Sequence, residues 1–396
     1  MIYYNSVHRL HRMYRIGFIL DNKHLFSNGL MQNAYFLYKI YLNLGNKCTL
    51  LSYDPSYKCL NGYESIPVQT ISIHPSEFDT SAYDILITVA VGISKLVYES
   101  CKRTNTLVIG FVCGNILANT ITGFIDPNPE HSSKLIGKDA PVDKVWLIEG
   151  HRYMKTFLEL TRGVPVQLVR HTWSSELLEI LAKKRNRASL LYKHIPSLTN
   201  KVNIVILEPN IDYVKSAVIP FSICEYVNKM NSDIINQVFI FNWNDTSKTV
   251  QHLANTFNVS KKTRFFKSLL IDEILNFFNS QSLPFIVVSH QLNNPWNYVY
   301  YEMLNYGIPL VHNSPDFKQL GYYYSDSNIE DGAGAVMNAI QYHTKLYELQ
   351  KPKIGKLIDS MNPSNSECQT YWKELLEQLH IDTSRLHQQA PVQDIL

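Results

Sequence analysis

Short apolar runs alternate with amphipathic stretches along most of the chain. Residues 15–20 (RIGFIL), 107–112 (LVIGFV) and 202–207 (VNIVIL) are nearly continuous apolar runs, which are typical of strands buried on both faces of a sheet. Between such runs, apolar residues recur three and four positions apart, as in residues 30–44, and this spacing predicts amphipathic helices. Alternating strands and helices predict parallel sheets, because parallel neighbours need a long crossover connection.

The pattern restarts once along the chain. It predicts strands over residues 15–20, 48–52, 68–73, 84–89, 107–112, 145–148 and 166–169, and then 202–207, 237–241, 263–266, 284–289 and 308–311. It predicts helices over residues 30–44, 94–103, 152–161, 213–229, 247–257, 271–280, 295–306, 332–350 and 366–379. Residues 123–143 hold Pro, Gly, Asn and Ser without periodicity, which predicts a long surface loop.

A polar, basic stretch between residues 183 and 201 separates the two alternating halves. The fold class is therefore expected to be α/β, with two Rossmann-like, doubly wound domains that face a central cleft. We expect residues 1–195 to form the N-terminal domain and residues 196–365 the C-terminal domain. Residues 366–396 would add a last helix and a loose tail.

The composition narrows the function classes. With 396 residues, 45% of them apolar, the chain can bury two cores, and a net charge of +3 gives no basic stripe for nucleic acid. The six cysteines show no zinc spacing, and no Asp-x-Asp pair indicates a metal-bound diphosphate. No apolar run is long enough for a signal peptide or a membrane span, so a cytoplasmic protein without metal or cofactor is expected.

The helix expected after the fourth strand of the second half is the most informative stretch. Asn294 is placed as its N-cap, Pro295 as its first residue, and Gly307 at its end. Its apolar face begins at Trp296, and Glu302 lies off that face. The helix pattern alone favours a solvated Glu302.

Polar residues follow several predicted strands, where ligands bind in open α/β sheets. In the second half they are Glu208, Asn210 and Lys215 after its first strand, and His290, Asn293, Asn294 and Asn297 after its fourth. In the first half they are Ser27, Asn28 and Gly29, then Asn115, then His151. The free N–H groups at a helix start attract anions, and His151 is a candidate base or hydroxyl binder. For each group an ordinary capped turn is the competing interpretation.

The two α/β halves, the helix with Glu302 and residues 307–311 (GIPLV) resemble GT-B glycosyltransferases that are themselves similar to glycogen synthase and bacterial mannosyltransferases. Those enzymes commonly carry two glutamates separated by seven residues before a G-x-P-V strand. Glu302 occupies the second position, and Asn294 stands where the first Glu would be. A closer resemblance is to a little-characterised bacterial and viral glycosyltransferase-like family, on SNG-x-x-QN (residues 27–33), EPN (208–210), NPWNY (294–298) and the segment from VHNS to GYYY (311–324).

The resemblance implies transfer of a sugar from a nucleoside diphosphate sugar to a glycan, lipid or protein acceptor. Glu302 would accept hydrogen bonds from the ribose hydroxyls, Lys215 would meet the phosphates, and Asn294 would face the sugar. The donor site would be completed by Glu208, Asn210, His290, Asn293 and Asn297. The acceptor and phosphate loop would hold Ser27, Asn28, Gly29, Asn33 and Asn115, with His151 and Glu302 in catalytic positions. The last helix would cross back onto the first half.

The departure at Asn294 leaves other hypotheses open. One is a catalytically inactive GT-B-fold subunit for nucleotide-sugar binding or assembly. Another is an epimerase of the same fold that acts on a nucleotide sugar without an acceptor.

Overall fold

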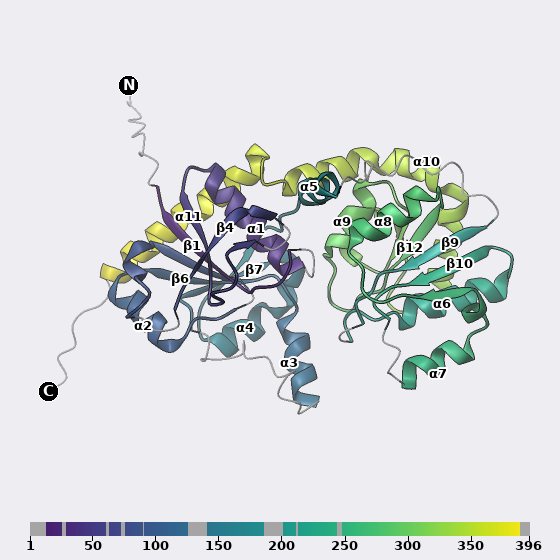
Figure 1. Ribbon diagram of the computed structural model, residues 1–396, viewed down its shortest axis with the longest axis horizontal. Coiled ribbons are helices and arrows are strands. Elements are labelled where there is room, and N and C mark those ends of the chain that lie inside the picture. The colour runs from purple at the N-terminus through teal and green to yellow at the C-terminus, as the bar shows by residue number, and fades with distance from the viewer. Residues whose placement is uncertain are drawn as a thin grey trace, which may run out of the picture.

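The computed structural model describes residues 13–25, 29–60, 63–72, 76–89, 91–125, 141–185, 201–210, 213–243 and 248–388. Two sheets lie side by side, each surrounded by helices (Figure 1). We name the part from residue 13 to 185 the N-terminal domain and the part from residue 201 to 361 the C-terminal domain. The predicted pair of parallel α/β sheets is confirmed.

The N-terminal sheet has eight strands in the order β3-β4-β2-β1-β5-β6-β7-β8. All neighbours pair in parallel except β3 with β4. The strands are β1 (Arg15–Leu20), β2 (Lys47–Ser52), β3 (Cys59–Leu60), β4 (Tyr63–Thr70), β5 (Ile85–Val89), β6 (Leu107–Val112), β7 (Lys144–Ile148) and β8 (Val166–Val169). The helices are α1 (Gly29–Asn43), η1 (Thr80–Ala82), α2 (Lys95–Arg103), α3 (Ile116–Ile125), η2 (Glu149–Met154), α4 (Lys155–Arg162) and α5 (Glu176–Lys184).

The C-terminal sheet has six parallel strands in the order β11-β10-β9-β12-β13-β14. They are β9 (Val202–Ile206), β10 (Ile235–Ile240), β11 (Thr263–Phe265), β12 (Phe285–Val288), β13 (Leu310–His312) and β14 (Tyr322–Tyr323). The helices are α6 (Val218–Met230), α7 (Lys248–Thr256), η3 (Asn258–Lys262), α8 (Ile271–Ser280), α9 (Tyr298–Asn305), η4 (Pro315–Phe317) and α10 (Ile329–Met361). The chain then continues as α11 (Ser366–Gln388).

Alternate side chains of each strand enter different cores, as the period of a strand requires. In β1, Phe18 packs in the core with α1, whereas its neighbour Ile19 packs on the opposite face with α2 and α4. In β9, Val205 packs towards α8 and α9, whereas Ile204 packs towards α6 and α10. Each sheet is therefore doubly wound, which explains why its strands are apolar without alternation.

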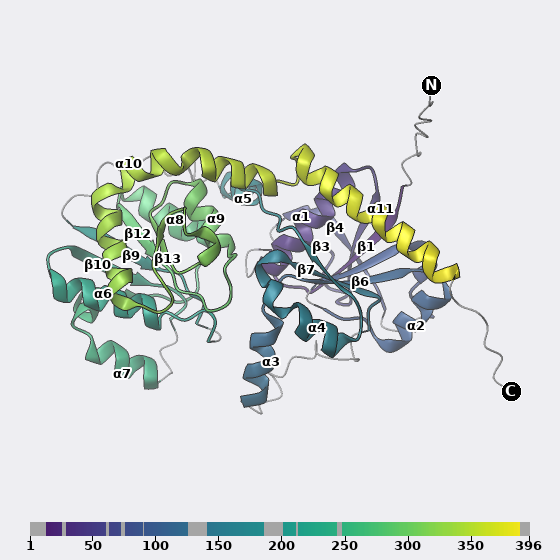
Figure 2. The same cartoon turned by 180° about the vertical axis from the view of Figure 1, so that it is seen from behind.

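The last two helices connect the domains. Helix α10 covers the C-terminal sheet, and α11 runs back along the N-terminal domain (Figure 2). There Trp372 packs edge-on against Tyr41 of α1 and Trp146 of β7, with ring centroids 6.0 and 5.7 Å away. The Arg170 guanidinium lies 4.7 Å from the Tyr371 ring centroid and pairs with Glu367 at 3.0 Å. These contacts fix α11 against the N-terminal domain.

Several local predictions were wrong. Residues 116–125, which overlap the predicted loop, form α3, and residues 176–184 form α5, for which no helix was predicted. Helix α9 begins at Tyr298, not at Pro295, and its N-cap is Asn297, whose side chain accepts a hydrogen bond from the Val299 N–H. Asn294 is therefore not a cap, because residues 294–297 extend across the domain boundary before the helix begins.

The strand order reverses once in each sheet, between β1 and β5 and between β9 and β12. Such a reversal leaves a crevice at the carboxyl ends of the two strands, and ligands of open α/β sheets bind there. The stretch that follows β9 includes Glu208, and the one that follows β12 includes Ser289–Asn297. Glu208 and the first residues of the loop after β12 therefore meet at one place.

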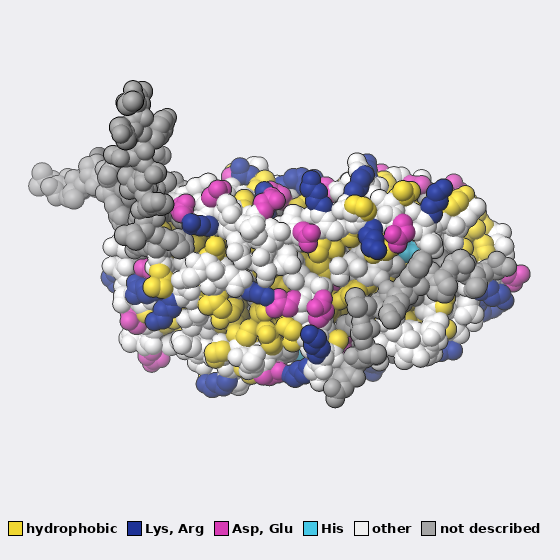
Figure 3. All heavy atoms as spheres, turned by 90° about the horizontal axis from the view of Figure 1, so that it is seen from above, with side chains coloured by type: hydrophobic (Ala, Val, Ile, Leu, Met, Phe, Trp, Pro, Cys, Tyr) yellow, Lys and Arg dark blue, Asp and Glu magenta, His cyan; other side chains and the backbone are white. Residues whose placement is uncertain are grey.

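On the face drawn in Figure 3, the acidic and basic side chains of the described residues are interspersed, so neither sign of charge dominates among them. None of the helices in the described ranges combines the length and the apolarity needed to cross a bilayer.

Candidate functional site

Glu208 lies where the strand order of the C-terminal sheet reverses, between β9 and β12, which we call the switch point. Its side chain is 2% exposed and accepts hydrogen bonds from the Ser289 hydroxyl, from the His290 N–H at 3.1 Å and from Gln291 Nε2 at 3.2 Å. Burial raises the pKa of Glu208 to about 7, although these donors and the Lys215 charge oppose the rise. Glu208 therefore fastens the loop after β12 to the end of β9.

His290 holds the same loop from its other side. Its Nδ1 lies 2.9 Å from the Tyr324 hydroxyl and its Nε2 lies 3.3 Å from the Ser327 hydroxyl. Burial lowers the pKa of His290 to about 4, so the ring is neutral at pH 7. Because both ring nitrogens have partners inside the domain, His290 positions the loop and leaves no nitrogen over for a ligand.

Asn210, like Glu208 and His290, holds segments of the C-terminal domain together. Its backbone is left-handed, with φ +53°, a conformation that Asn tolerates better than most residues. Its Oδ1 accepts a hydrogen bond from the Ala217 N–H at 2.8 Å, and its Nδ2 donates to the carbonyls of Glu208 and Asn242 at 3.0 and 3.2 Å. Asn210 therefore ties β9 to the start of α6.

Lys215 lies between groups of both domains. Its backbone forms an isolated antiparallel bridge with Gln291. Its ammonium group lowers the pKa of Glu208 in its own domain and that of His151 in the other domain. The side chain is half-buried. A positive charge at this boundary is well placed to meet an anionic ligand held between the domains.

The three asparagines after β12 have different positions. Asn293 is exposed, with φ +49°, and its carbonyl accepts hydrogen bonds from the Tyr153 hydroxyl at 2.6 Å and from Asn115 Nδ2 at 3.3 Å. Asn294 is 6% exposed and donates from Nδ2 to Gln291 Oε1. Asn297 caps α9. Asn293 thus connects the loop to the N-terminal domain, whereas the amide of Asn294 is engaged within the loop.

Glu302 is buried, in contrast to the solvated residue that the helix pattern favoured. It is 3% exposed, and its charge would act on the neighbouring hydroxyls of Tyr298 and Tyr306. Burial alone raises the pKa of Glu302 to about 8, so the carboxyl group is mostly protonated at pH 7. Glu302 is the one carboxyl group on α9, and burial keeps it neutral.

Two buried histidines face this region from the N-terminal domain. His151, in η2 after β7, is 2% exposed, and burial together with the Lys215 charge lowers its pKa to about 4. His171, after β8, is 4% exposed, and burial lowers its pKa to about 3. Within the part of the chain that the structure describes, His151 Nδ1 and both His171 nitrogens lack hydrogen-bond partners. A buried polar atom without a hydrogen-bond partner lowers the stability of the fold, and such atoms often belong to functional sites.

The predicted acceptor loop is only partly described. Ser27 and Asn28 lie outside the described residues. Gly29 begins α1, and Asn33 donates from Nδ2 to the Gly29 carbonyl at 2.7 Å, while its buried Oδ1 has no partner in the described ranges. Asn115 Oδ1 accepts from the Ala118 N–H at 2.9 Å at the start of α3. Asn115 reaches the domain boundary through its bond to the Asn293 carbonyl, and Gly29 lies there against the Tyr298 ring.

Residues 294–298 (NPWNY) of the C-terminal domain pack against two glycines of the N-terminal domain. A Cβ at Gly150 would lie 2.8 Å from the Trp296 ring, and one at Gly29 would lie 3.1 Å from the Tyr298 ring. The Tyr298 hydroxyl donates to the Thr172 carbonyl at 3.1 Å. Glycine is needed at both places because the aromatic rings occupy the space of a side chain.

Sequence reasoning missed several residues of this region. His171 and the pair formed by Arg152 and Asp316 were not singled out, although the structure places them at the boundary between the domains. The position of His171, directly after a predicted strand, was the one available signal. The sequence around Arg152 and Asp316 gives no such signal, because their pairing depends on two segments that only the fold brings together.

Solved glycosyltransferases share the arrangement of the two domains. A glycosyltransferase from Rickettsia africae ESF-5 is 13% identical and aligns over 94% of this chain and 98% of its own, with a TM-score of 0.54. HepE from Anabaena, solved with UDP-glucose, is 11% identical over 93% and 99%, with a TM-score of 0.57. Sucrose-phosphate synthase from Thermosynechococcus elongatus is 9% identical over 94% and 100%, with a TM-score of 0.59.

These likenesses define the class of fold. The chain has the GT-B fold of nucleotide-sugar glycosyltransferases, as the sequence resemblance implied. By sequence, it belongs to the family described as "Protein of unknown function (DUF2827)", whose profile matches residues 16–376. No protein with a curated description matches it.

Proposed function

We propose that this protein is a glycosyltransferase that moves a sugar from a nucleoside diphosphate sugar to an acceptor without a metal ion. One observation carries the proposal. At the switch point of the C-terminal sheet, Lys215 lies near both His151 and the loop after β12 that Glu208 holds in place. Solved structures with the same fold also support the proposal, since HepE was solved with UDP-glucose.

Lys215 would supply the charge that the leaving group needs. Transfer breaks the bond between the anomeric carbon and the diphosphate, and negative charge develops on the departing phosphate oxygen. An ammonium group held between the domains neutralises that charge without a metal ion. Asn294 and the backbone N–H groups near it would face the same anion.

His151 would act on the acceptor side. Its pKa of about 4 keeps the ring neutral at pH 7, and Nδ1 has no partner among the described residues. A neutral imidazole nitrogen can accept a hydrogen bond, and then the proton, from an attacking hydroxyl group. Glu302 would accept hydrogen bonds from the ribose hydroxyls, and such bonds stabilise the ionised form of a carboxyl group whose pKa is about 8 in the structure.

A second candidate function is nucleotide-sugar binding without turnover. It is favoured by Asn294, which replaces the first glutamate of the family pattern and whose amide group donates to Gln291. In that function the protein would hold the nucleotide sugar as a binding or assembly subunit.

One experiment separates the two functions. Purified full-length protein is mixed with UDP-, GDP- and dTDP-sugars in EDTA, and both thermal stabilisation and donor hydrolysis are measured. A ligand that binds only the folded state raises the melting temperature. Stabilisation with hydrolysis supports the glycosyltransferase, and stabilisation without hydrolysis or transfer supports the binding subunit. The absence of both contradicts the proposal.

A further inference from the structure

His171 is a buried histidine at the domain boundary. It follows β8, is 4% exposed, and neither of its ring nitrogens has a hydrogen-bond partner among the residues that the structure describes. Three aromatic rings surround its own, those of Trp296, Tyr298 and Tyr301, with centroids 5.7, 5.1 and 5.4 Å away. All three rings belong to the C-terminal domain, so the packing of the two domains encloses His171.

His151 follows the neighbouring strand, β7. The two strands pair in parallel with Ile148 opposite Val169, and His151 and His171 come three and two residues after these positions. Paired strands lie about 4.8 Å apart, so the two segments leave the sheet side by side. Both segments pack on the Trp296 indole, one through the His171 ring and the other through the glycine before His151, where a Cβ would lie 2.8 Å from the indole. Burial and, after it, the charge of His151 lower the pKa of His171, so the two rings lie close enough to act on one another.

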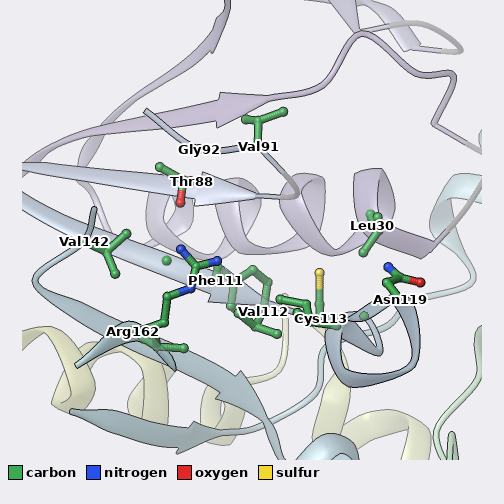
Figure 4. Close-up of a pocket in the computed structure, with 14 residues that line it drawn as sticks. Leu30, Thr88, Val91, Gly92, Phe111, Val112, Cys113, Asn119, Val142 and Arg162 are labelled. Carbon is green, nitrogen blue, oxygen red and sulfur yellow. The ribbon is translucent and has the colours of Figure 1, made fainter. Parts of the chain in front are cut away.

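The cavity of the N-terminal domain does not serve these nitrogens. It has a volume of about 90 Å³ and extends along β6, with Phe111 and Val112 in its wall, and neither histidine lines it (Figure 4). Buried polar groups are almost always hydrogen-bonded, either to protein or to ordered water. The partners of the enclosed nitrogens must therefore come from the boundary itself.

Each of the two rings offers one donor and one acceptor. Burial lowers the pKa of His151 to about 4 and that of His171 to about 3, so both rings are neutral at pH 7. A neutral imidazole has one N–H group and one bare nitrogen that accepts a hydrogen bond. Because Nδ1 of His151 is enclosed by protein atoms, Nε2 is the nitrogen left for an attacking hydroxyl group. For Nε2 to accept that proton, Nδ1 must carry the hydrogen of the neutral ring and needs an acceptor for it.

We propose that His171 is a positioning residue that keeps the ring proton of His151 on Nδ1. One nitrogen of His171 accepts the hydrogen bond from Nδ1–H through a bound water molecule, since the two rings do not bond directly. The other nitrogen donates to a hydroxyl group beside it. Thr172 Oγ1 and the Tyr301 hydroxyl are both buried there, and neither has a partner within the described ranges. The role of His171 in transfer rests on the proposed function, whereas the hydrogen bond does not.

The transfer step balances with this arrangement. The hydroxyl oxygen of the acceptor forms a bond to the anomeric carbon of the donor, and the bond from that carbon to the diphosphate breaks. The electron pair leaves with the nucleoside diphosphate, and the hydroxyl proton passes to Nε2 of His151. Nδ1–H stays bonded, so the base keeps its orientation, as when a third group orients the base of a catalytic triad. The imidazolium then releases its Nε2 proton to solvent.

The tautomer of His151 is tested first, by nitrogen NMR at pH 7 of the full-length protein with nitrogen-15-labelled histidine. His151→Gln assigns the signals of His151 by their loss. We expect the wild type to carry the proton on Nδ1, because the hydrogen bond that one nitrogen makes sets the tautomer. A wild-type His151 with its proton on Nε2 would overturn the proposal, and this outcome does not depend on the folding of any variant.

Variants of His171 then test the source of the tautomer. His171→Leu removes both nitrogens and should release the proton of His151 from Nδ1. His171→Asn and His171→Gln place a carbonyl oxygen near the position of Nδ1 or of Nε2, and one of them should restore the wild-type tautomer. His252→Leu, at an exposed position of α7, is the matched control and should leave His151 unchanged. A folded His171→Leu protein that keeps the proton on Nδ1, or a failure of both amides to restore it, would contradict the assignment.

Turnover is tested second, with the sugar donor that the wild type uses fastest. His171→Leu should lower kcat at least about tenfold, since a general base contributes roughly 10²–10⁴-fold. The KM of the donor should not change, because the lost interaction acts on the base alone. The amide variant that restores the tautomer should recover kcat, and His252→Leu should equal the wild type.

The two measurements separate the hydrogen bond from its role. A wild-type kcat in His171→Leu, with its tautomer altered, would overturn the role of His171 in transfer. If the wild type neither binds nor hydrolyses any donor, the proposed function fails, and the NMR result for the two histidines stands by itself.

Discussion

Arg152 donates two hydrogen bonds of 2.9 Å to the carboxylate of Asp316, which lies 164 positions further along the chain. The same carboxylate accepts a third from Trp296 Nε1 at 2.6 Å. Arg152 directly follows His151, and Trp296 packs against Gly150 on the other side of that histidine. The position of His151 is therefore coupled to the packing of the two domains against one another.

Asp316→Asn should loosen this connection. The side chain of Arg152 is 53% exposed, so the ion pair is worth only about 0.5–1 kcal/mol, and the free energy of unfolding should fall by about that amount. The hydrogen bonds from Arg152 hold the pKa of Asp316 below its usual value, so the stabilisation is present above pH 3.8 and is lost as the pH falls through the lowered pKa. Small-angle scattering should show a larger radius of gyration for the variant.

A surface pair within one helix provides the control for that comparison. Lys155 and Glu159 lie 3.7 Å apart in α4, and Glu159→Gln removes their charge attraction without touching the boundary. Its radius of gyration should equal that of the wild type. Equal radii for Asp316→Asn and Glu159→Gln would show that the Arg152–Asp316 pair does not hold the domains together.

Gly150→Ala should destabilise the protein. The added Cβ would lie 2.8 and 2.9 Å from atoms of Trp296, closer than such contacts occur, so the indole must shift. Overpacking of this kind typically costs about 1–3 kcal/mol. Gly334→Ala is the matched variant, because no atom lies within 4 Å of its Cβ and α10 should gain about 0.5–1 kcal/mol from the lost glycine. Chemical denaturation that gives both variants the same stability would contradict the contact.

Lys215→Met should weaken nucleoside diphosphate binding by about tenfold or more, because a charge-assisted contact to phosphate is worth about 1.5–3 kcal/mol. Titration with UDP and with uridine measures the effect, and only UDP binding should change. Lys356→Met removes an exposed lysine from α10 and should bind UDP like the wild type. If Lys215→Met binds UDP as tightly as this control, Lys215 does not face the diphosphate.

Glu302→Gln should stabilise the protein in a pH-dependent manner. In the folded state the pKa of Glu302 is raised to about 8 from the model-peptide value of 4.5, so the unfolded chain ionises first. Between these pH values the wild type loses up to about 1.4 kcal/mol of stability per pH unit, and the variant lacks this loss. Chemical denaturation should therefore show a small difference in the free energy of unfolding between the variant and the wild type at pH 4.5, and a large one at pH 8.

The same residue should be needed for the donor. Glu302→Ala should abolish donor use while the apolar face of α9 keeps the fold, and calorimetry of the wild type near pH 7 in two buffers should detect proton release on donor binding. That release is expected because hydroxyl donors stabilise the ionised carboxylate. Wild-type turnover by a folded Glu302→Ala variant would remove Glu302 from the site.

The strands were predictable because each lies buried on both faces. Strands β1, β6 and β8 begin and end at the predicted residues, since a continuous apolar run marks both limits. Helix α3 was missed because its sequence, ILANTITGFI, has β-branched residues and glycine and lacks a clear helical period. The start of α9 was misplaced because Asn294 and Asn297 are both acceptable caps, and tertiary contacts of Trp296 decided between them.

By itself the sequence determined the two doubly wound sheets and the side of each sheet at which polar residues gather, because both follow from local periodicity and from the order of strands and helices. Only the tertiary structure decided which of those residues face one another. Glu302 became buried, and Lys215 came to lie between Glu208 and His151, where Trp296 and Tyr298 pack against the N-terminal domain. Contacts between loops so far apart in the chain leave no periodic trace in the sequence.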